Sequence, residues 1–454
     1  MIEKAPDLDN YSLDLISDFK HEKTYTSLIV PQLNKIEKDY QYWDKIKYIK
    51  KPKSLIMENQ EDYPLEVWRL VKTQREFNLK NYSLRRSESK SKFSNRIGVD
   101  YKFYSNPYLQ QKLHYLDFNF GAGIQKEKLL SDLDKEQYLN NALMEESIFS
   151  SMIEGATTTR VKAKEMLRKK KKPRNKSEQM ILNNYQAIQY ISEHQDDEIS
   201  IQKLFEIHQL VTENTLDSEN VGVFRTSNDV HVMNEITGEI VHTPPEFEEL
   251  NELMQSFCEF FNSNPKENFI HPIVKASILH FLIGYIHPFV DGNGRTARAI
   301  FYWYLLKNGY WLAEYLSISR VIMKTKTQYE KAYIYTEIDD MDVTYFIHYQ
   351  VKILTQAFED LKKYIAKKKT EQKDISRFLK LKNINERQAQ ILFWIEKDAE
   401  RSFTVKEVET IFSVTNQTAR TDLEELVEKN LLKKIAINKK SSNYWKGDSF
   451  DNLS

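Results

Sequence analysis

The chain contains 454 residues, which is enough for two or three domains. Lysine plus arginine and aspartate plus glutamate each number 66, so the formal net charge is zero and no overall field favours nucleic acid or a membrane surface. The single cysteine, Cys258, excludes an internal disulfide. Because the N-terminal residues form no secretory signal and glycine and proline are scarce, we expect a mainly helical, cytoplasmic protein that does not enter a membrane.

The residue pattern changes twice along the chain and predicts three blocks, at residues 1–100, 101–365 and 366–454. In the first block, short amphipathic stretches such as Tyr40, Trp43 and Ile46 precede a Ser/Lys-rich run at residues 85–92. No pattern of catalytic or ligand-binding side chains stands out there. We predict a helical N-terminal region whose role the sequence leaves open.

The second block begins with a helical pattern that ends in a short polar motif. Apolar residues recur at helical spacing over residues 139–148, and Ser-Ser-Met-Ile-Glu-Gly follows at residues 150–155. Taken alone, this string is also typical of a helix that ends at Gly155. A basic run at residues 168–176 comes next, and because it contains no aromatic residue we predict a solvated loop between helices rather than a nucleic-acid patch.

Alternating apolar residues then predict a β-hairpin in this otherwise helical block. Residues 230–233 and 239–242 read as two strands, and the segment between them contains an Ile-Thr-Gly turn. From residue 272 to residue 286 the spacing returns to that of a buried helix, whose apolar run is far shorter than the roughly 18 residues that span a bilayer. Gly284 inside this helix indicates close helix packing, and His280 fits a core histidine better than a second catalytic one.

Residues 287–298, His-Pro-Phe-Val-Asp-Gly-Asn-Gly-Arg-Thr-Ala-Arg, combine groups that suit a magnesium-bound polyphosphate. Asp291 is a ligand for a hard cation, and glycines at 292 and 294 allow backbone N–H groups to turn toward an anion. Arg295 and Arg298 would share one face of a helix that begins here, and His287 can carry a proton. An EF-hand lacks its required glycine and glutamate in this string, and a Walker loop lacks its glycine–lysine pair. The following helix, over residues 299–306, is stopped by Asn308 and Gly309.

This string resembles the active-site loop of the Fic (Fido) domain family, H-P-F-x-D/E-G-N-G-R-x-x-R, and it matches at every fixed position. Members of that family transfer AMP from ATP to a Ser, Thr or Tyr hydroxyl of a protein. The resemblance therefore implies a protein adenylyltransferase that uses ATP and Mg²⁺, with a target protein (itself included) as acceptor. It also implies a mainly α fold, a Fic-type helical bundle with a β-hairpin flap.

The family's site residues carry over onto matching positions of this chain. His287 would be the base that takes the proton from the attacking hydroxyl, a role that suits nucleotidyl transfer, where positioning and charge neutralisation dominate. The nucleotide would be held by Asp291 through Mg²⁺, by the backbone of Gly292, Asn293 and Gly294, and by Arg295 and Arg298 at the β- and γ-phosphates.

The motif at residues 150–155 resembles the family's inhibitory motif, S/T-x-x-x-E-G/N. Ser150, Glu154 and Gly155 occupy its fixed positions. By the resemblance, Glu154 pairs with Arg298 and blocks the γ-phosphate position, since a carboxylate competes for the guanidinium and repels phosphate.

Two further features are similar to family elements. The hairpin matches the flap whose edge pairs with an extended segment of the target, with Val232 and Val241 as contact candidates, although a plain structural hairpin is an alternative. Tyr329 and Tyr333 are candidates to face the adenine, although aromatic residues at helical spacing are also typical of a core.

The third block resembles a small C-terminal winged helix-turn-helix domain. Helices are predicted at residues 385–396, 404–412 and 415–429, followed by two strands, and Thr404 begins a capping box. The lysine-rich stretch at residues 362–373 would be a linker helix or a hinge. Asn416, Gln417 and Arg420 would begin the recognition helix with side chains that suit base edges. Nearby glutamates weaken the case for DNA, so DNA binding and protein docking both stay open.

Three functions remain in competition at this point. The first is a protein adenylyltransferase restrained by Glu154, and the second is a DNA-binding regulator in which the Fic core senses a nucleotide. The third is removal of AMP from modified proteins, with Glu154 aligning a water. The sequence does not identify the target protein. It also does not show whether the transferred group is AMP, a nucleotide with another base, or phosphocholine, or whether the chain forms a homodimer.

Overall fold

The computed structural model describes residues 2–6, 8, 29–52, 63–84, 98–120, 132–233, 237–264, 266, 269–438 and 441–450. The Ser/Lys-rich run at residues 85–92 and part of the predicted hairpin turn, residues 234–236, lie outside these ranges. As predicted, helices dominate, and the strands of the described ranges form three separate antiparallel pairs. In the same ranges, no helix is both long and apolar enough to cross a membrane.

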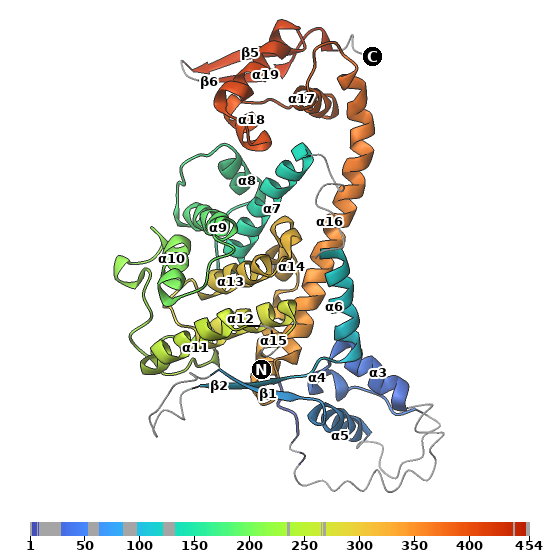
Figure 1. Cartoon of the computed structure of the whole chain (residues 1–454), viewed down its shortest axis with the longest axis vertical. Helices are drawn as coiled ribbons and strands as arrows, with labels where there is room; N and C mark the ends of the chain where they lie inside the picture. Colours follow the sequence, from blue (N-terminus) through green and yellow to red (C-terminus); the bar gives the residue numbers. More distant parts are fainter. Residues whose placement is uncertain are drawn as a thin grey trace.

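The N-terminal region packs against the bottom of the molecule as drawn (Figure 1). A buried ion pair and a buried hydrogen bond tie it to the central block: Lys72 Nζ lies 2.7 Å from Asp339 Oδ1, and Arg75 donates to the Tyr345 hydroxyl at 2.8 Å. Strands β1 and β2 pair across the boundary expected near residue 100. The elements of this region are α3 (Val30–Asp39), α4 (Trp43–Ile46), α5 (Tyr63–Glu76), β1 (Lys80–Leu84) and β2 (Val99–Phe103).

The central block is a helical bundle around one large hydrophobic core. Its middle pair, α12 (Pro272–Ile286) and α13 (Asn293–Lys307), runs side by side (Figure 1). The 287–298 motif, called the loop below, comprises the connection between these helices and the first residues of α13. Around this pair lie α6 (Pro107–Phe120), α7 (Asp132–Ile153), α8 (Arg160–Arg168), α9 (Lys176–Glu193), α10 (Ile201–Thr212), η3 (Ser218–Asn220), β3 (Val232–Met233), β4 (Ile240–His242), η4 (Phe247–Glu249), α11 (Leu250–Asn262), η5 (Trp311–Tyr315), α14 (Ile318–Lys324) and α15 (Lys326–Ile338).

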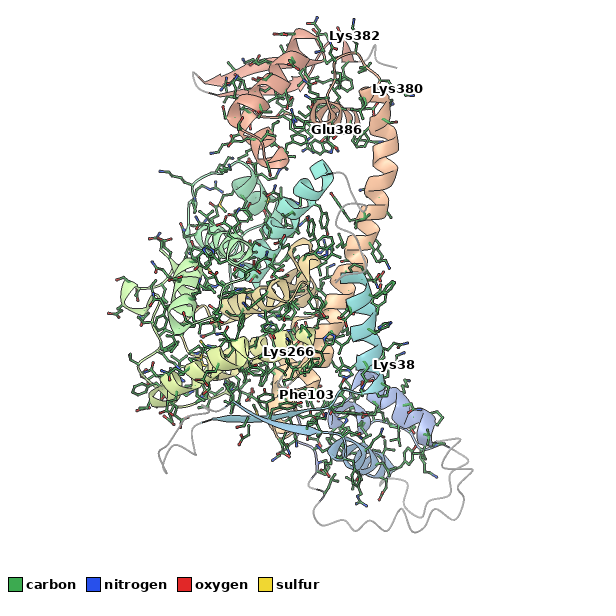
Figure 2. All side chains as sticks on the ribbon, in the orientation of Figure 1. Lys38, Phe103, Lys266, Lys380, Lys382 and Glu386 are labelled. Atoms are coloured by element: carbon green, nitrogen blue, oxygen red, sulfur yellow. The ribbon has the colours of Figure 1, made fainter. Side chains whose placement is uncertain are left out.

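A single long helix, α16 (Thr344–Leu379), runs from the central core to the C-terminal domain. The lysine-rich stretch at residues 362–373 is therefore part of a continuous helix. Figure 2 shows Lys380, Lys382 and Glu386 where the chain passes from α16 into the C-terminal domain. That domain has its own core and the predicted order of elements: α17 (Glu386–Lys397), α18 (Val405–Phe412), α19 (Asn416–Glu428), β5 (Leu432–Asn438) and β6 (Ser441–Lys446).

The basic run at residues 168–176 connects α8 to α9 and is mostly exposed, as predicted, and it also contacts the C-terminal domain. Arg168 pairs with Glu407 of α18, and Lys170 Nζ lies 3.4 Å from Glu409 Oε1. Thr404 caps α18 as predicted by accepting from the Glu407 backbone N–H. The Glu407 carboxylate is directed to Arg168 instead of completing the capping box, because the ion pair outcompetes the local hydrogen bond.

Candidate functional site

Helix α12 brings the loop to the centre of the bundle and ends abruptly at it. His287 is the C-cap, with φ +49°, so the chain turns away from the helix at this residue. Gly284 allows α15 to pack directly on the helix, since an added Cβ would lie 2.5 Å from the Tyr333 hydroxyl. The close packing predicted at Gly284 is confirmed.

The His287 ring is oriented by its own helix. Its Nδ1 lies 3.2 Å from the Gly284 carbonyl oxygen, an acceptor, so Nδ1 carries the proton and Nε2 is left with a lone pair. Burial lowers the pKa of His287 to about 4. The imidazole is therefore neutral at pH 7 and can accept a proton.

The glycine bend after Asp291 leaves the start of α13 open. Gly292 has φ +87°, and a Cβ there would approach Thr212 Cγ2 to 2.8 Å. No side chain caps α13. The Asn293 side chain instead binds the backbone of Phe289, accepting from its N–H at 3.0 Å and donating to its carbonyl at 2.8 Å. An uncapped helix start with its positive dipole end is suited to an anion.

His208 supports the loop from α10, and sequence reasoning missed it. Its Nδ1 accepts from the Gly222 N–H at 3.0 Å, so its Nε2–H donates to the Asp291 carbonyl at 2.8 Å. The ring also stacks on Phe289 with centroids 3.8 Å apart. Burial lowers the pKa of His208 to about 4. No local signal in the sequence marks this residue, because its partners lie far along the chain.

The two arginines of the loop are buried and turn toward different helices. Arg295 is fully buried, donates to the Val211 carbonyl of α10 and lies 3.3 Å from Asp291 Oδ1. Arg298 faces α7 instead. Within the described ranges, Arg295 Nε and Arg298 Nη1 are buried donors without a hydrogen-bond acceptor. Such donors call for an added acceptor, and a phosphate supplies several.

Helix α7 delivers the 150–155 motif to Arg298. The guanidinium donates to the Ser150 hydroxyl at 2.8 Å, to the Ser150 carbonyl at 2.9 Å and to Glu154 Oε1 at 2.9 Å. The Glu154 carboxylate lies directly over Gly294, where an added Cβ would come within 2.1 Å of Oε1. Gly155, with φ +88°, ends the helix. Glu154 therefore both follows a helix end and contacts the side of the loop that carries Gly294 and Arg298.

The position of α7 is set by a buried carboxylate two turns before Glu154. Glu146 accepts from the Ser319 backbone N–H at 2.9 Å and from the Ser317 hydroxyl at 3.1 Å, both in or beside α14. Burial raises the pKa of Glu146.

The two tyrosine candidates for the adenine contact the core. The Tyr329 hydroxyl lies 2.9 Å from His280 Nε2, and the Tyr333 ring packs on Phe281 and Phe346. His280 is a core histidine as predicted, and its two ring nitrogens contact the Tyr329 hydroxyl and the Gln350 side-chain amide. A role at the adenine stays a prediction.

The predicted hairpin forms beside the loop. Strand β3 pairs with β4, with Val232 opposite His242 and a register shift after Val232. Val241 is 37% exposed, so its side chain is accessible. Arg225 anchors the base of the hairpin, donating from Nε to the His287 carbonyl at 3.0 Å. Contact between the hairpin and a target stays a prediction.

In the C-terminal domain, Asn416, Gln417 and Arg420 are exposed on the first turns of α19, the recognition helix. Glu424, one turn later, accepts from the Tyr444 hydroxyl at 2.8 Å and pairs with Lys434. One of the glutamates that weighed against DNA is thus neutralised within the domain.

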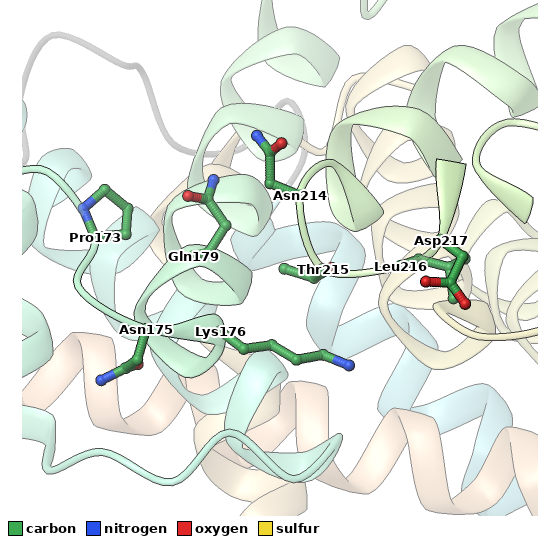
Figure 3. Close-up of a pocket in the computed structure, with 8 residues that line it drawn as sticks. All are labelled: Pro173, Asn175, Lys176, Gln179, Asn214, Thr215, Leu216 and Asp217. Carbon is green, nitrogen blue, oxygen red and sulfur yellow. The ribbon is translucent and has the colours of Figure 1, made fainter. Parts of the chain in front are cut away.

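A polar cavity of about 400 Å³ lies apart from the loop, between the start of α9 and the segment after α10 (Figure 3). Its lining includes Lys176 and Asp217 but no residue of the 287–298 loop. It is therefore a separate feature from the candidate site.

Two segments of the chain match known protein families. Residues 198–305 match the Fic/DOC family and residues 387–436 match a DeoR-like helix-turn-helix domain. The chain is 30% identical over 196 residues to protein adenylyltransferase Fic of Nematostella vectensis. This alignment covers 41% of this chain and 44% of that protein. It is 34% identical over 163 residues to protein adenylyltransferase Fic of Drosophila willistoni, covering 35% of this chain and 31% of that protein. The matches thus span less than half the length of these relatives.

Solved structures with a similar arrangement include a Fic family protein from Desulfovibrio desulfuricans, with TM-score 0.47, 17% identity and coverage of 75% of this chain and 94% of that chain. Fic-1 (residues 134–508) from C. elegans gives TM-score 0.43 at 22% identity, covering 57% of this chain and 72% of that chain. On the sequence matches and the loop motif, this chain is a Fic/DOC-domain protein, homologous to protein adenylyltransferases, with a DeoR-like helix-turn-helix domain after the Fic domain.

Proposed function

We propose that this protein transfers AMP from ATP to a hydroxyl group of a protein and that Glu154 restrains the reaction. The observation that carries the proposal is the position of the Glu154 carboxylate, on Arg298 and over Gly294, beside an uncapped helix start. A carboxylate there occupies the place of a phosphate and makes the same charge-assisted contact. The residues around it are those of a polyphosphate site.

The donors present fit a magnesium nucleotide. Buried Arg298 Nη1 lacks an acceptor, and no side chain caps the first turn of α13. The described residues contain no cluster of three or more His, Cys, Asp or Glu side chains that could hold a metal. Asp291 would therefore hold Mg²⁺ together with phosphate oxygens, as this cation commonly binds. When bound, Mg²⁺ neutralises charge on the phosphates.

The chain's own groups account for the remaining chemistry. The acceptor oxygen attacks the α-phosphorus while the bond to the β-bridging oxygen breaks, and pyrophosphate leaves. His287 Nε2 takes the proton of the acceptor hydroxyl, because Nδ1 is already committed to Gly284. Arg295 and Arg298 stabilise the negative charge of the leaving phosphates.

The test compares AMP transfer by wild type, Glu154→Gly and Glu154→Gln in reactions that contain labelled ATP and a cell lysate. Glu154→Gly should raise transfer by about 10- to 100-fold, the range for loss of a charge-assisted contact. Glu154→Gln should give less, since an amide still binds Arg298 but does not repel phosphate. Adding His287→Ala to Glu154→Gly should abolish transfer, whereas His114→Ala, at an exposed position, should not. Mass spectrometry of the labelled acceptor identifies the transferred group.

Two outcomes would redirect the proposal. If Glu154→Gly is no more active than wild type on any acceptor, the restraint by Glu154 is wrong. If wild type releases AMP from a modified protein and Glu154→Gly does not, the site works in the direction of AMP removal.

A second proposed activity is binding of duplex DNA by the C-terminal domain. It is favoured by the DeoR-like match and by the exposed Asn416, Gln417 and Arg420 at the start of α19. Binding should weaken steeply with salt, because phosphate contacts dominate affinity. Duplex binding that survives Arg420→Ala unchanged at all salt concentrations would favour another surface, and no duplex binding at all would favour a role in protein docking.

A further inference from the structure

His242 on strand β4 joins the hairpin to the helices behind it. Its Nδ1 lies 2.8 Å from Glu337 Oε2 on α15, and its Nε2 lies 2.6 Å from the Tyr285 carbonyl oxygen in the last turn of α12. The side chain is 8% exposed, so water does not substitute readily for either contact. Two sequence-distant helices thus hold one strand of the hairpin through a single imidazole.

The chemistry of the two partners determines the protons in this contact. A backbone carbonyl accepts only, and an ionised carboxylate accepts only. Two hydrogen bonds to two acceptors need two donated protons, whereas a neutral imidazole has one. The pair of His242 and Glu337 therefore holds an extra proton, with an imidazolium facing a carboxylate as its charge-assisted form.

The location favours a positive charge. Tyr285 lies in the last turn of α12, where backbone carbonyls and the helix dipole present negative charge. The groups that face His242 are Glu337 from α15, the Tyr285 carbonyl and ring from α12, and His287 beyond the end of that helix. Tyr285 is two residues from His287, so the same contact ties the hairpin to the helix end that presents the base.

We propose that His242 is a positioning residue, a latch that fixes strand β4 of the hairpin against α12 and α15 so that an acceptor segment lying along the hairpin reaches His287. The proposal rests on the proposed transfer of AMP to a protein hydroxyl. His242 touches neither substrate in this arrangement, and it acts through the strand that carries it.

An electrostatic effect points the same way. Burial is the main cause that lowers the pKa of His287, and the nearby charge of His242 lowers it as well. A latched hairpin thus accompanies a neutral His287.

The first test measures kinetics in the Glu154→Gly background with a fixed acceptor peptide taken from the labelled site. His242→Ala should raise the KM for the peptide by about tenfold, the loss expected for a hydrogen bond to a charged group, with the KM for ATP and kcat little changed. His231→Ala, an exposed histidine at the start of the same hairpin, is the matched control and should leave all three constants unchanged.

The second test separates the latch from a merely structural role. In Glu337→Gln an amide N–H can donate to the Nδ1 of a neutral His242 while Nε2–H still donates to Tyr285. Hydrogen-exchange protection of residues 237–242, corrected for the intrinsic rate, should therefore stay near the wild-type level in Glu337→Gln and fall in His242→Ala, which removes both contacts.

The results distinguish the two proposals. If Glu154→Gly shows no transfer, the proposed function fails, and hydrogen exchange still decides on the latch. If transfer occurs but His242→Ala leaves the peptide KM within about twofold and hairpin protection unchanged, well below the effect of a lost charged hydrogen bond, the latch is wrong. A protection that falls as far in Glu337→Gln as in His242→Ala would also overturn it.

Discussion

The 287–298 loop and the start of the recognition helix α19 both place polar residues at a helix N-terminus, but they are built differently. Helix α13 has no side-chain cap, and its arginines Arg295 and Arg298 are at most 1% exposed. Helix α19 is capped by Thr415, which accepts from the Thr418 N–H at 3.2 Å, and its Arg420 is exposed. The first region has buried donors that call for an anion, whereas the second is satisfied internally and offers only surface side chains.

This difference determines how much the structure of each region says about the ligand or partner that it binds. A buried guanidinium N–H without an acceptor costs free energy unless a ligand supplies one, so it constrains the ligand's charge and position. Exposed side chains are solvated in the free protein and place no such constraint. The loop therefore indicates a polyphosphate, while α19 is compatible with several classes of partner.

The largest predicted effect comes from removing the buried charge at the loop. Arg298→Ala in the Glu154→Gly background should lower kcat/KM for ATP by about 100-fold or more, because charge stabilisation is lost in a buried site. Arg320→Ala, at a partly exposed ion pair with Asp360, is the control and should change it little. Steady-state kinetics with ATP decides, and an unaffected Arg298→Ala would show that the loop does not bind phosphate through its buried arginine.

The next prediction concerns pH at the same loop. The pKa of His287 is lowered by burial to about 4, so the base is neutral above that value and becomes protonated as the pH falls through it. At saturating acceptor, kcat of Glu154→Gly should hold down to about pH 5, reach half its plateau near pH 4, and fall by up to about tenfold per pH unit below that. An acid limb centred near 6.5, the ordinary value for histidine, would instead indicate a solvated base.

The same shift predicts a stability change. Between about pH 4 and the ordinary pKa near 6.5, the unfolded chain binds a proton at His287 that the folded chain does not. The free energy of unfolding should therefore fall as the pH drops through this window, and His208 adds to it in the same direction. Urea denaturation of wild type and a His208→Gln variant at several pH values measures the contribution of His208.

A smaller effect is expected from the glycine bend. Gly292→Ala places a Cβ at φ +87° and within 2.8 Å of Thr212 Cγ2, so the free energy of unfolding should fall by about 2–3 kcal/mol. Gly309→Ala shares a positive φ of +82° but has no atom within 4 Å, and it should lose about 1 kcal/mol. Equal losses in the two variants would mean that crowding against α10 does not shape the bend.

The smallest prediction tests the contact between α8 of the central block and α18 of the C-terminal domain. Arg168→Glu should release the C-terminal domain from α8, with a loss of about 1 kcal/mol or less, because the Arg168 side chain is partly exposed. Glu407→Arg added to Arg168→Glu should restore the ion pair in reverse. Small-angle scattering monitors the docking, and Lys172→Glu is a control in the same basic run. Scattering profiles that do not differ among these variants would show that the ion pair does not hold the domain.

Sequence reasoning succeeded where residues close in the chain determine the structure. The periodicity of residues 272–286 indicates a buried helix, and the glycines of the loop imply a bend regardless of the surrounding fold. Thr415 predicts the start of α19 because a cap needs only the next turn. The loop was recognisable alone, whereas the motif at residues 150–155 gained meaning only together with it. By the family resemblance, the two implied a contact between Glu154 and Arg298.

The tertiary structure alone decided which distant groups meet. His208 and His242 reach the site from elements far from the loop, and neither is marked by local spacing, since an imidazole on a helix or strand is equally compatible with a core or a surface. Arg295 and Arg298 begin on one helix turn, yet α10 and α7 draw their side chains apart. Local sequence determines helix and turn through backbone geometry, whereas the partners of buried charges depend on how whole elements pack, which no short window contains.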